Sequence, residues 1–168
     1  DKFINNIKEI GLCIAGQTQN LVPADKKLYA LRNVTSTVDS IPLIASSIMS
    51  KKIASGADKI VLDVKTGSGA FMKNIDDSVR LAKTMINIGK SIGKDTVALI
   101  TNMDEPLGNN VGNSLEVIEA IEVLKGRGPK DLKHLAFELS ATMISLSTGE
   151  NIKKCRKSVT EAVEKGRA

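Results

Sequence analysis

Hydrophobic positions along this chain form short continuous runs that alternate with longer stretches of helical spacing. Two runs rich in β-branched residues, Lys59–Lys65 and Thr96–Thr101, have the length and composition of buried strands. A third apolar run, Ile10–Ala15, ends at Gly16 and predicts another buried strand. Elsewhere apolar residues recur every three or four positions, which predicts helices. Strands that alternate with helices in this way indicate a parallel sheet with flanking helices.

Two consecutive helices interrupt this alternation. Pro23 stands just before the first, which covers Ala24–Arg32, and Ser40-Ile41-Pro42 begins the second, which runs to about Ile53. Proline suits the first turn of a helix because the N–H groups there have no partner within the helix. The pattern therefore predicts a helical segment inserted into the series of strands and helices.

The expected fold class is α/β, with a parallel-type sheet, flanking helices and an inserted helical segment that belongs to a smaller α lobe. Residues 1–20 and 55–168 are assigned to the α/β lobe, and residues 24–54 to the α lobe.

Composition narrows the range of functions. The 168 residues are 42% hydrophobic and 26% charged, which is enough to form a core, and the positive residues behind the net charge of +5 are scattered. Aromatic residues make up 2%, which argues against binding of single-stranded nucleic acid by base stacking. A single histidine, His134, argues against multi-histidine zinc sites. Cys13 and Cys155 form no CxxC motif, which indicates a reducing compartment such as the cytoplasm. No apolar run reaches the length of a membrane span.

The loops that follow the two predicted strands are where ligands bind in parallel α/β sheets. The first contains Thr66–Gly69, and glycine-rich turns can hold an anion with backbone N–H groups. Its spacing matches neither the Walker motif nor the dinucleotide-binding motif, so a tight structural turn and a ligand contact are both open. The second contains Asn102–Glu105, whose carboxylates either hold a metal or simply form a turn.

Ser47 and Lys51 are four residues apart on a predicted helix and therefore share one face with Ile44 and Ile48. An apolar wall that carries one hydroxyl and one ammonium group suits a flat polar heterocycle. A surface lysine with a serine one turn earlier is the alternative. Arg32 ends the preceding helix, where a cation interacts favourably with the helix dipole.

Four segments resemble the pyrimidine-nucleoside phosphorylases and the closely related thymidine phosphorylases. They are Pro23–Lys52, which begins Pro-Ala-Asp-Lys-Lys-Leu-Tyr-Ala-Leu-Arg, then Val61–Met72, Met103–Gly108 and Gly112–Val117. The resemblance covers nearly the whole chain to about Leu132. It implies a glycosyltransferase that catalyses reversible phosphorolysis of uridine, thymidine and deoxyuridine to the free base and (deoxy)ribose 1-phosphate.

The resemblance also assigns roles to residues. Arg32, Ser47 and Lys51 match the base-binding residues of the family, so that Arg32 and Lys51 would donate to the pyrimidine carbonyl oxygens and Ser47 would hydrogen-bond ring N3. The apolar positions around the ring match Val38, Ile44 and Phe71. No catalytic residue is assigned within the chain.

A monovalent cation and a second subunit are implied as well. Leu107, Asn110 and Glu119 match positions that supply oxygen ligands to potassium in some pyrimidine-nucleoside phosphorylases. The intact enzymes are homodimers with contacts in the helical lobe, to which residues 24–53 would contribute. Their phosphate-binding segment corresponds to a region before Asp1, so we expect this chain to be a central fragment that is inactive alone.

Three alternatives remain open. Thymidine-restricted and broad-specificity phosphorylases share Arg32, Ser47 and Lys51. The chain is otherwise a non-catalytic α/β fragment, or part of a related phosphoribosyltransferase, which would use a pyrophosphate site.

Overall fold

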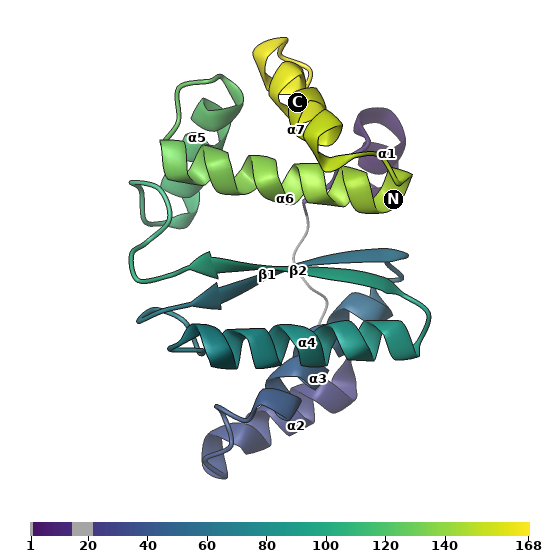
Figure 1. Ribbon diagram of the computed structural model, residues 1–168, viewed down its shortest axis with the longest axis vertical. Helices are drawn as coiled ribbons and strands as arrows, with labels where there is room; N and C mark the ends of the chain where they lie inside the picture. The colour runs from purple at the N-terminus through teal and green to yellow at the C-terminus, as the bar shows by residue number, and fades with distance from the viewer. Residues whose placement is uncertain (1, 15–21) are drawn as a thin grey trace.

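A parallel sheet lies between two layers of helices in the computed structural model, which describes residues 2–14 and 22–168 (Figure 1). Strands β1 (Lys59–Thr66) and β2 (Asp95–Asn102) pair in parallel, from Lys59 opposite Asp95 to Thr66 opposite Asn102. Both strands therefore end at the same edge of the sheet, and the loops that follow them are neighbours.

Helix α4 connects the two strands and covers one face of the sheet, while α6 covers the other (Figure 1). Helix α3 packs against α4 and shares a core with β1, α2 lies next to α3, and α7 packs on α6. The helices of the described residues are α1 (Lys2–Ile10), α2 (Pro23–Val34), α3 (Ile41–Ala54), α4 (Ile75–Ser91), α5 (Asn113–Leu124), α6 (Lys130–Thr148) and α7 (Ile152–Glu164).

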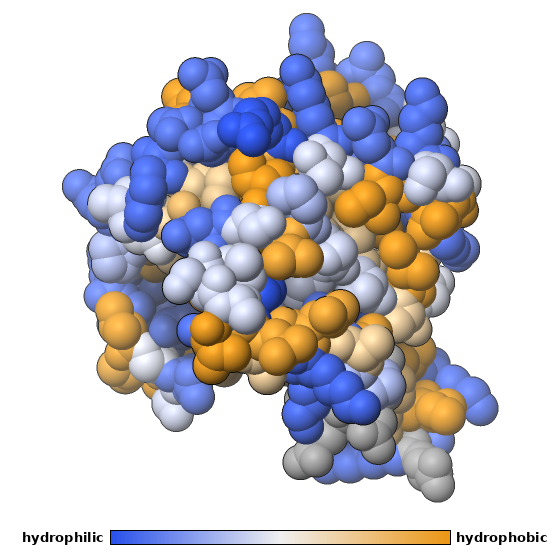
Figure 2. All heavy atoms as spheres, turned by 90° about the horizontal axis from the view of Figure 1, so that it is seen from below, coloured by the Kyte–Doolittle hydropathy of each residue, from blue (hydrophilic) through white to orange (hydrophobic). Residues whose placement is uncertain are grey.

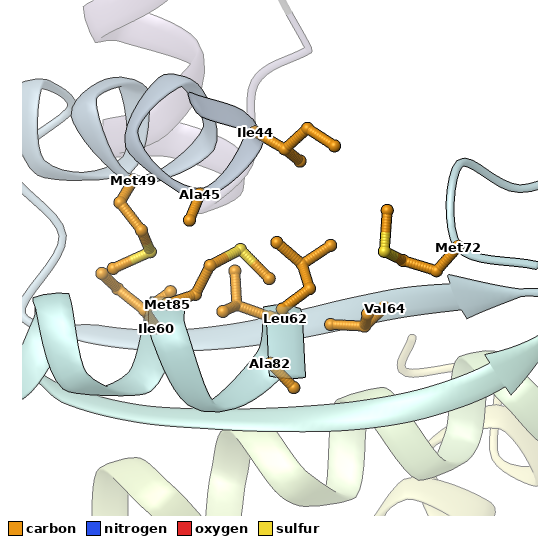
Figure 3. Close-up of a cluster of buried hydrophobic side chains, with 10 residues drawn as sticks. Ile44, Ala45, Met49, Ile60, Leu62, Val64, Met72, Ala82 and Met85 are labelled. Atoms are coloured by element: carbon orange, nitrogen blue, oxygen red, sulfur yellow. The ribbon is translucent and has the colours of Figure 1, made fainter. Parts of the chain in front are cut away.

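The main hydrophobic core lies between β1, α4 and α3 (Figure 3). Alternate residues of β1 point into it, because successive side chains of a strand face opposite sides of the sheet. Met49 of α3 and Met85 of α4 are almost fully buried there. The buried members are Ile44, Ala45, Met49, Ile60, Leu62, Val64, Met72, Leu81, Ala82 and Met85. This core fixes the position of α3 relative to the end of β1.

The expected α/β class with parallel strands is confirmed, as are the two consecutive helices α2 and α3. The division into lobes of residues 1–20 with 55–168 and residues 24–54 stays a prediction. Within the described residues, α3 shares one core with β1 and α4.

The strand predicted over Ile10–Ala15 is wrong. Ile10 is the last residue of α1, residues 12–14 form no regular element, and Ala15 and Gly16 lie outside the described residues. The apolar residues of α1 are Phe3, Ile4, Ile7 and Ile10. They recur with helical spacing, and this spacing favours a helix that includes Ile10 over a strand that begins there. Ile14 is 92% exposed, so the run lacks the burial that a central strand requires.

The face of the molecule at the α2 end mixes hydrophobic and hydrophilic side chains (Figure 2). Helix α2 leaves Leu28, Leu31 and Val34 exposed. Among the described residues, no helix combines the length and the apolar character that crossing a bilayer demands.

Candidate functional site

Helices α2 and α3 carry the charged side chains of the candidate site. Asp25 lies in the first turn of α2 and Arg32 in its last turn. Lys51 lies in the last turn of α3, one turn after Ser47. An acidic residue at a helix start and a basic residue at a helix end both interact favourably with the helix dipole, so each side chain suits its local position.

The ammonium group of Lys51 makes three contacts. Its Nζ donates to Oδ2 of Asp25 at 2.6 Å, to Oγ of Ser47 at 3.0 Å and to the Ser47 carbonyl oxygen at 3.2 Å. The Asp25 side chain is 11% exposed and that of Lys51 is 35% exposed. Lys51 is therefore an ordered cation at the edge of the protein interior, and it is not a freely solvated surface lysine.

Arg32 is a buried cation with an unused hydrogen-bond donor. The residue is 5% exposed, its Nη2 donates to the carbonyl oxygen of Val38, and its guanidinium lies 5.0 Å from the centre of the Tyr29 ring. Its Nε is buried and has no hydrogen-bond partner within the described part of the chain. Leaving such a donor unsatisfied is costly, so the described residues alone do not account for the hydrogen bonding of Arg32.

The carboxyl group of Asp25 is held in its ionised form. Burial by itself would raise its pKa, but hydrogen bonds from Lys51 and Ser47 and the charges of Lys51 and Arg32 together lower the pKa below its ordinary value of 3.8. At neutral pH the site therefore contains one carboxylate and two cations whose charges act on it.

The structure thus brings Ser47 and Lys51 into direct contact. Arg32 acts through its charge on the carboxylate of Asp25, which also contacts Lys51. Whether these residues bind a base stays a prediction. Asp25 belongs to the site but was not among the expected residues. Its position two helical turns before Arg32, on the same face of α2, is the sequence signal that could have identified it.

A cavity of about 270 Å³ opens at the carboxyl end of β1, between α3 and the loop that follows the strand. Its walls are mainly apolar and include Ile44, Ile48, Gly69, Phe71, Met72 and Met103. Ile44 and Phe71, both expected around a ring, line this cavity together, whereas Val38 supplies the carbonyl that Arg32 contacts. Ile44 and Ile48 share their face of α3 with Ser47 and Lys51, although Ser47 and Lys51 do not line the cavity themselves.

The glycine loop uses its backbone N–H groups within the protein. The amide of Gly67 donates to the Met72 carbonyl at 3.0 Å, that of Ser68 to Oδ1 of Asp104 at 2.7 Å, and that of Gly69 to the Met103 carbonyl at 2.8 Å. All three amides thus donate to oxygens of the protein, and one of these oxygens belongs to the carboxylate of Asp104. Of the two interpretations left open, the structure supports the tight turn, which here joins the loops that follow β1 and β2.

Replacing Gly67 with alanine should destabilise this junction. Gly67 has a φ of +123°, and an added Cβ would lie 2.5 Å from Oδ1 of Asp104. We expect urea unfolding to show that the free energy of unfolding falls by about 1–3 kcal/mol, the usual cost of a strained backbone position.

Gly93→Ala is the matched control for that measurement, because Gly93 also has a positive φ, +72°, but has no atom within 4 Å of an added Cβ. Equal losses for the two variants would contradict a specific fit between Gly67 and Asp104.

The loop 107–110 packs around Glu119 of α5. Glu119 is 5% exposed, and its Oε1 accepts a hydrogen bond from the Asn109 amide at 3.0 Å. An added Cβ on Gly108 would lie 2.3 Å from Oε2 of Glu119, so the backbone approaches this carboxylate closely. The Gly108 amide donates to Oδ2 of Asp131 at 2.9 Å; this and a backbone hydrogen bond from Leu132 lower the pKa of Asp131.

Two carboxylates, those of Glu119 and Asp131, accept hydrogen bonds from backbone amides of this loop. Two of the expected cation ligands, Leu107 and Asn110, flank the segment that contacts the third, Glu119. Backbone carbonyls with one carboxylate form a donor set that suits a hard cation. Among the described residues, no group of three or more His, Cys, Asp or Glu side chains is placed to hold a metal. The carboxylate of Asp104, considered above for a metal, accepts the Ser68 amide instead.

Comparisons with known proteins show which family this chain belongs to. A family model described as "Glycosyl transferase family, a/b domain" matches residues 1–168. Pyrimidine-nucleoside phosphorylases from Staphylococcus aureus strains USA300, NCTC 8325 / PS 47 and COL are each 54% identical to this chain over 167 residues. The matched region is 99% of this chain and 39% of each relative, so the chain spans well under half the length of these proteins.

The similarity to pyrimidine-nucleoside phosphorylases that the four segments predicted is therefore confirmed. Since the family model extends over the entire sequence, the chain belongs to the glycosyl transferase family and contains its a/b domain.

Proposed function

We propose that this chain provides the base-binding part of a pyrimidine-nucleoside phosphorylase. The observation that carries the proposal is the buried Arg32, whose Nε has no partner among the described residues and whose charge acts on Asp25, the carboxylate that contacts Lys51. The apolar cavity is lined by Ile44 and Ile48 of α3, the helix that also carries Ser47 and Lys51. A pyrimidine offers two carbonyl oxygens, a ring N–H and flat apolar faces. Cationic donors, a hydroxyl and an apolar wall are complementary to these groups.

In the proposed reaction a phosphate oxygen forms a bond to C1′ of the nucleoside as the bond from C1′ to N1 breaks. The electron pair of the broken bond moves onto the base, which leaves as an anion and then takes up a proton. Arg32 and Lys51 would donate to the carbonyl oxygens, where this negative charge accumulates, and Ser47 would hydrogen-bond N3. Preorganised donors aimed at developing charge lower the barrier because they need no reorganisation during the reaction.

The substrates are pyrimidine nucleosides and phosphate, and uridine, thymidine and deoxyuridine are the proposed nucleosides. An assay on the complete protein that contains this chain tests this, with each nucleoside in the presence and absence of phosphate. Release of base that requires phosphate supports the proposal. Turnover of thymidine alone would favour the restricted enzyme, a requirement for pyrophosphate would favour a phosphoribosyltransferase, and no turnover would favour a non-catalytic role.

A potassium site is part of the same proposal. Carbonyl oxygens of Leu107 and Asn110 and the carboxylate of Glu119 would hold the ion. The positive charge would offset the repulsion among these oxygens and steady the 107–110 loop, which follows the strand that pairs with β1.

Replacing Glu119 with glutamine should raise the potassium concentration needed for half-maximal activity about ten- to hundredfold, the usual loss when one interaction of a metal site is removed. Activity of the complete protein is measured across potassium concentrations, with tetramethylammonium keeping ionic strength constant. Glu105→Gln is the control, because Glu105 is exposed in the same loop region. Activity that is independent of potassium in the unmodified protein would contradict the site.

A homodimer and a cytoplasmic location complete the proposal. The exposed Leu28, Leu31 and Val34 of α2 are the surface that this chain would contribute to a dimer. The free thiols of Cys13 and Cys155 are compatible with a reducing compartment.

A further inference from the structure

The position of the Lys51 ammonium depends on a residue from another helix. Two of its three acceptors belong to Ser47, one turn earlier on α3, and the third is the carboxylate of Asp25 on α2. The Asp25 contact, at 2.6 Å, is the shortest of the three and the only one between opposite charges. Hydrogen bonds of this kind are the strongest that a lysine makes in a protein.

Without Asp25, Lys51 would lose its only contact outside its own helix among those that the structure describes. A lysine side chain has many rotamers, and fixing it costs conformational entropy. Because Lys51 is 35% exposed, water would be available to solvate the freed ammonium. The side chain would then sample positions away from Ser47.

The negative charge of Asp25 also offsets two positive charges. The buried Arg32 and Lys51 both act on its carboxylate, which the surrounding charges keep ionised. A pocket that places two cations near one neutral base needs a negative charge nearby, because burying like charges together is unfavourable. Asp25 is the carboxylate that contacts Lys51 directly.

We infer that Asp25 is a positioning residue of the base pocket, whose carboxylate holds the Lys51 ammonium beside Ser47. The ammonium has three N–H groups, and the one that makes the longest contact, 3.2 Å to the Ser47 carbonyl oxygen, would turn to a pyrimidine carbonyl oxygen when the base binds. This inference rests on the proposed function of Arg32, Ser47 and Lys51. Asp25 does not touch the base in this scheme and acts through Lys51.

A double-mutant cycle in the complete protein tests the inference. The variants are Asp25→Asn, Lys51→Met and the double variant, and kcat and KM are measured for phosphorolysis of uridine. Asp25→Asn is expected to lower kcat/KM at least about tenfold, as loss of one charged hydrogen bond does. In the Lys51→Met background the same change should lower it less than about twofold, because the two residues act as one unit.

The matched control is Asp39→Asn, since Asp39 is exposed between α2 and α3 and undergoes the same chemical change. It should leave kcat/KM unchanged. The thermal midpoint of every variant is measured in parallel. If Asp25→Asn does not fold, Asp25→Glu replaces it, which keeps the charge but moves it by one methylene, and the same dependence on the Lys51 background is required.

The outcomes separate the inference from the proposed function. A loss in kcat/KM that is equal in both backgrounds would show that Asp25 serves the fold in general and would overturn the inference. Unchanged activity of Asp25→Asn, together with a large loss for Lys51→Met, would overturn the inference and leave the base pocket standing. Unchanged activity of Lys51→Met would overturn both.

Discussion

Replacing Lys51 with methionine in the complete protein is expected to lower kcat for pyrimidine-nucleoside phosphorolysis about 100- to 1000-fold, the usual loss when one preorganised donor to developing charge is removed. Methionine keeps most of the length and apolar surface of the side chain but cannot donate a hydrogen bond. The effect should fall on kcat more than on KM, because negative charge on the base carbonyls is greater in the transition state than in the bound nucleoside.

The neighbouring residue supplies the control for this prediction. Lys52 lies in the same last turn of α3 but is exposed, and no ion pair involves it among the described residues. Lys52→Met should therefore leave kcat within about twofold, as surface changes away from a site usually do. Similar losses for Lys51→Met and Lys52→Met would mean that general positive charge, and no specific donor, accounts for the effect.

The second large effect is expected when this chain is tested without the rest of the complete protein. A polypeptide of these 168 residues alone is expected to show no phosphate-dependent release of uracil or thymine. The Gly67, Ser68 and Gly69 amides already donate to protein oxygens, so this loop cannot hold phosphate without giving up those bonds. Phosphate must be held opposite the base, since orientation of the two reactants supplies much of the acceleration.

The measurement is the release of base from uridine and thymidine, with and without phosphate, by the purified chain and by the complete protein in parallel. A helical circular dichroism spectrum of the chain shows that an inactive sample is folded. Phosphate-dependent turnover on the order of 1–1000 per second, as in ordinary enzymes, would contradict the prediction. Variants in which Asp104 is replaced would then show whether the glycine loop holds the anion.

Local patterns in the sequence predicted most of the elements. The β-branched run at Lys59–Lys65 became β1, and Pro23 and Pro42 each lie at the start of a helix. These features act over a few residues, so they can be recognised without knowing what packs against them. The Ile10–Ala15 run was misinterpreted because a short apolar run does not reveal whether it will be buried. Most of its described part is exposed.

The candidate site was only partly accessible from the sequence. Ser47 and Lys51 could be paired because helical spacing alone puts them on one face. The role of Asp25 could not be deduced in this way, because its contact with Lys51 joins two helices across 26 positions of sequence. The glycine loop is similar, since Asp104 reaches Ser68 only because β1 and β2 are parallel and end together.

The sequence by itself determined most of the secondary structure, the α/β class, the resemblance to the phosphorylases and the shared face of Ser47 and Lys51. Only the tertiary structure decided that Arg32 is buried with a donor that has no partner among the described residues, that Asp25 contacts Lys51, and that Asp104 accepts the Ser68 amide of the glycine loop. The physical reason is how far apart in the sequence the interacting residues lie. Backbone conformation and periodicity depend on neighbouring residues, whereas burial, pairing of charges and the use of backbone donors depend on which distant segments the core brings together.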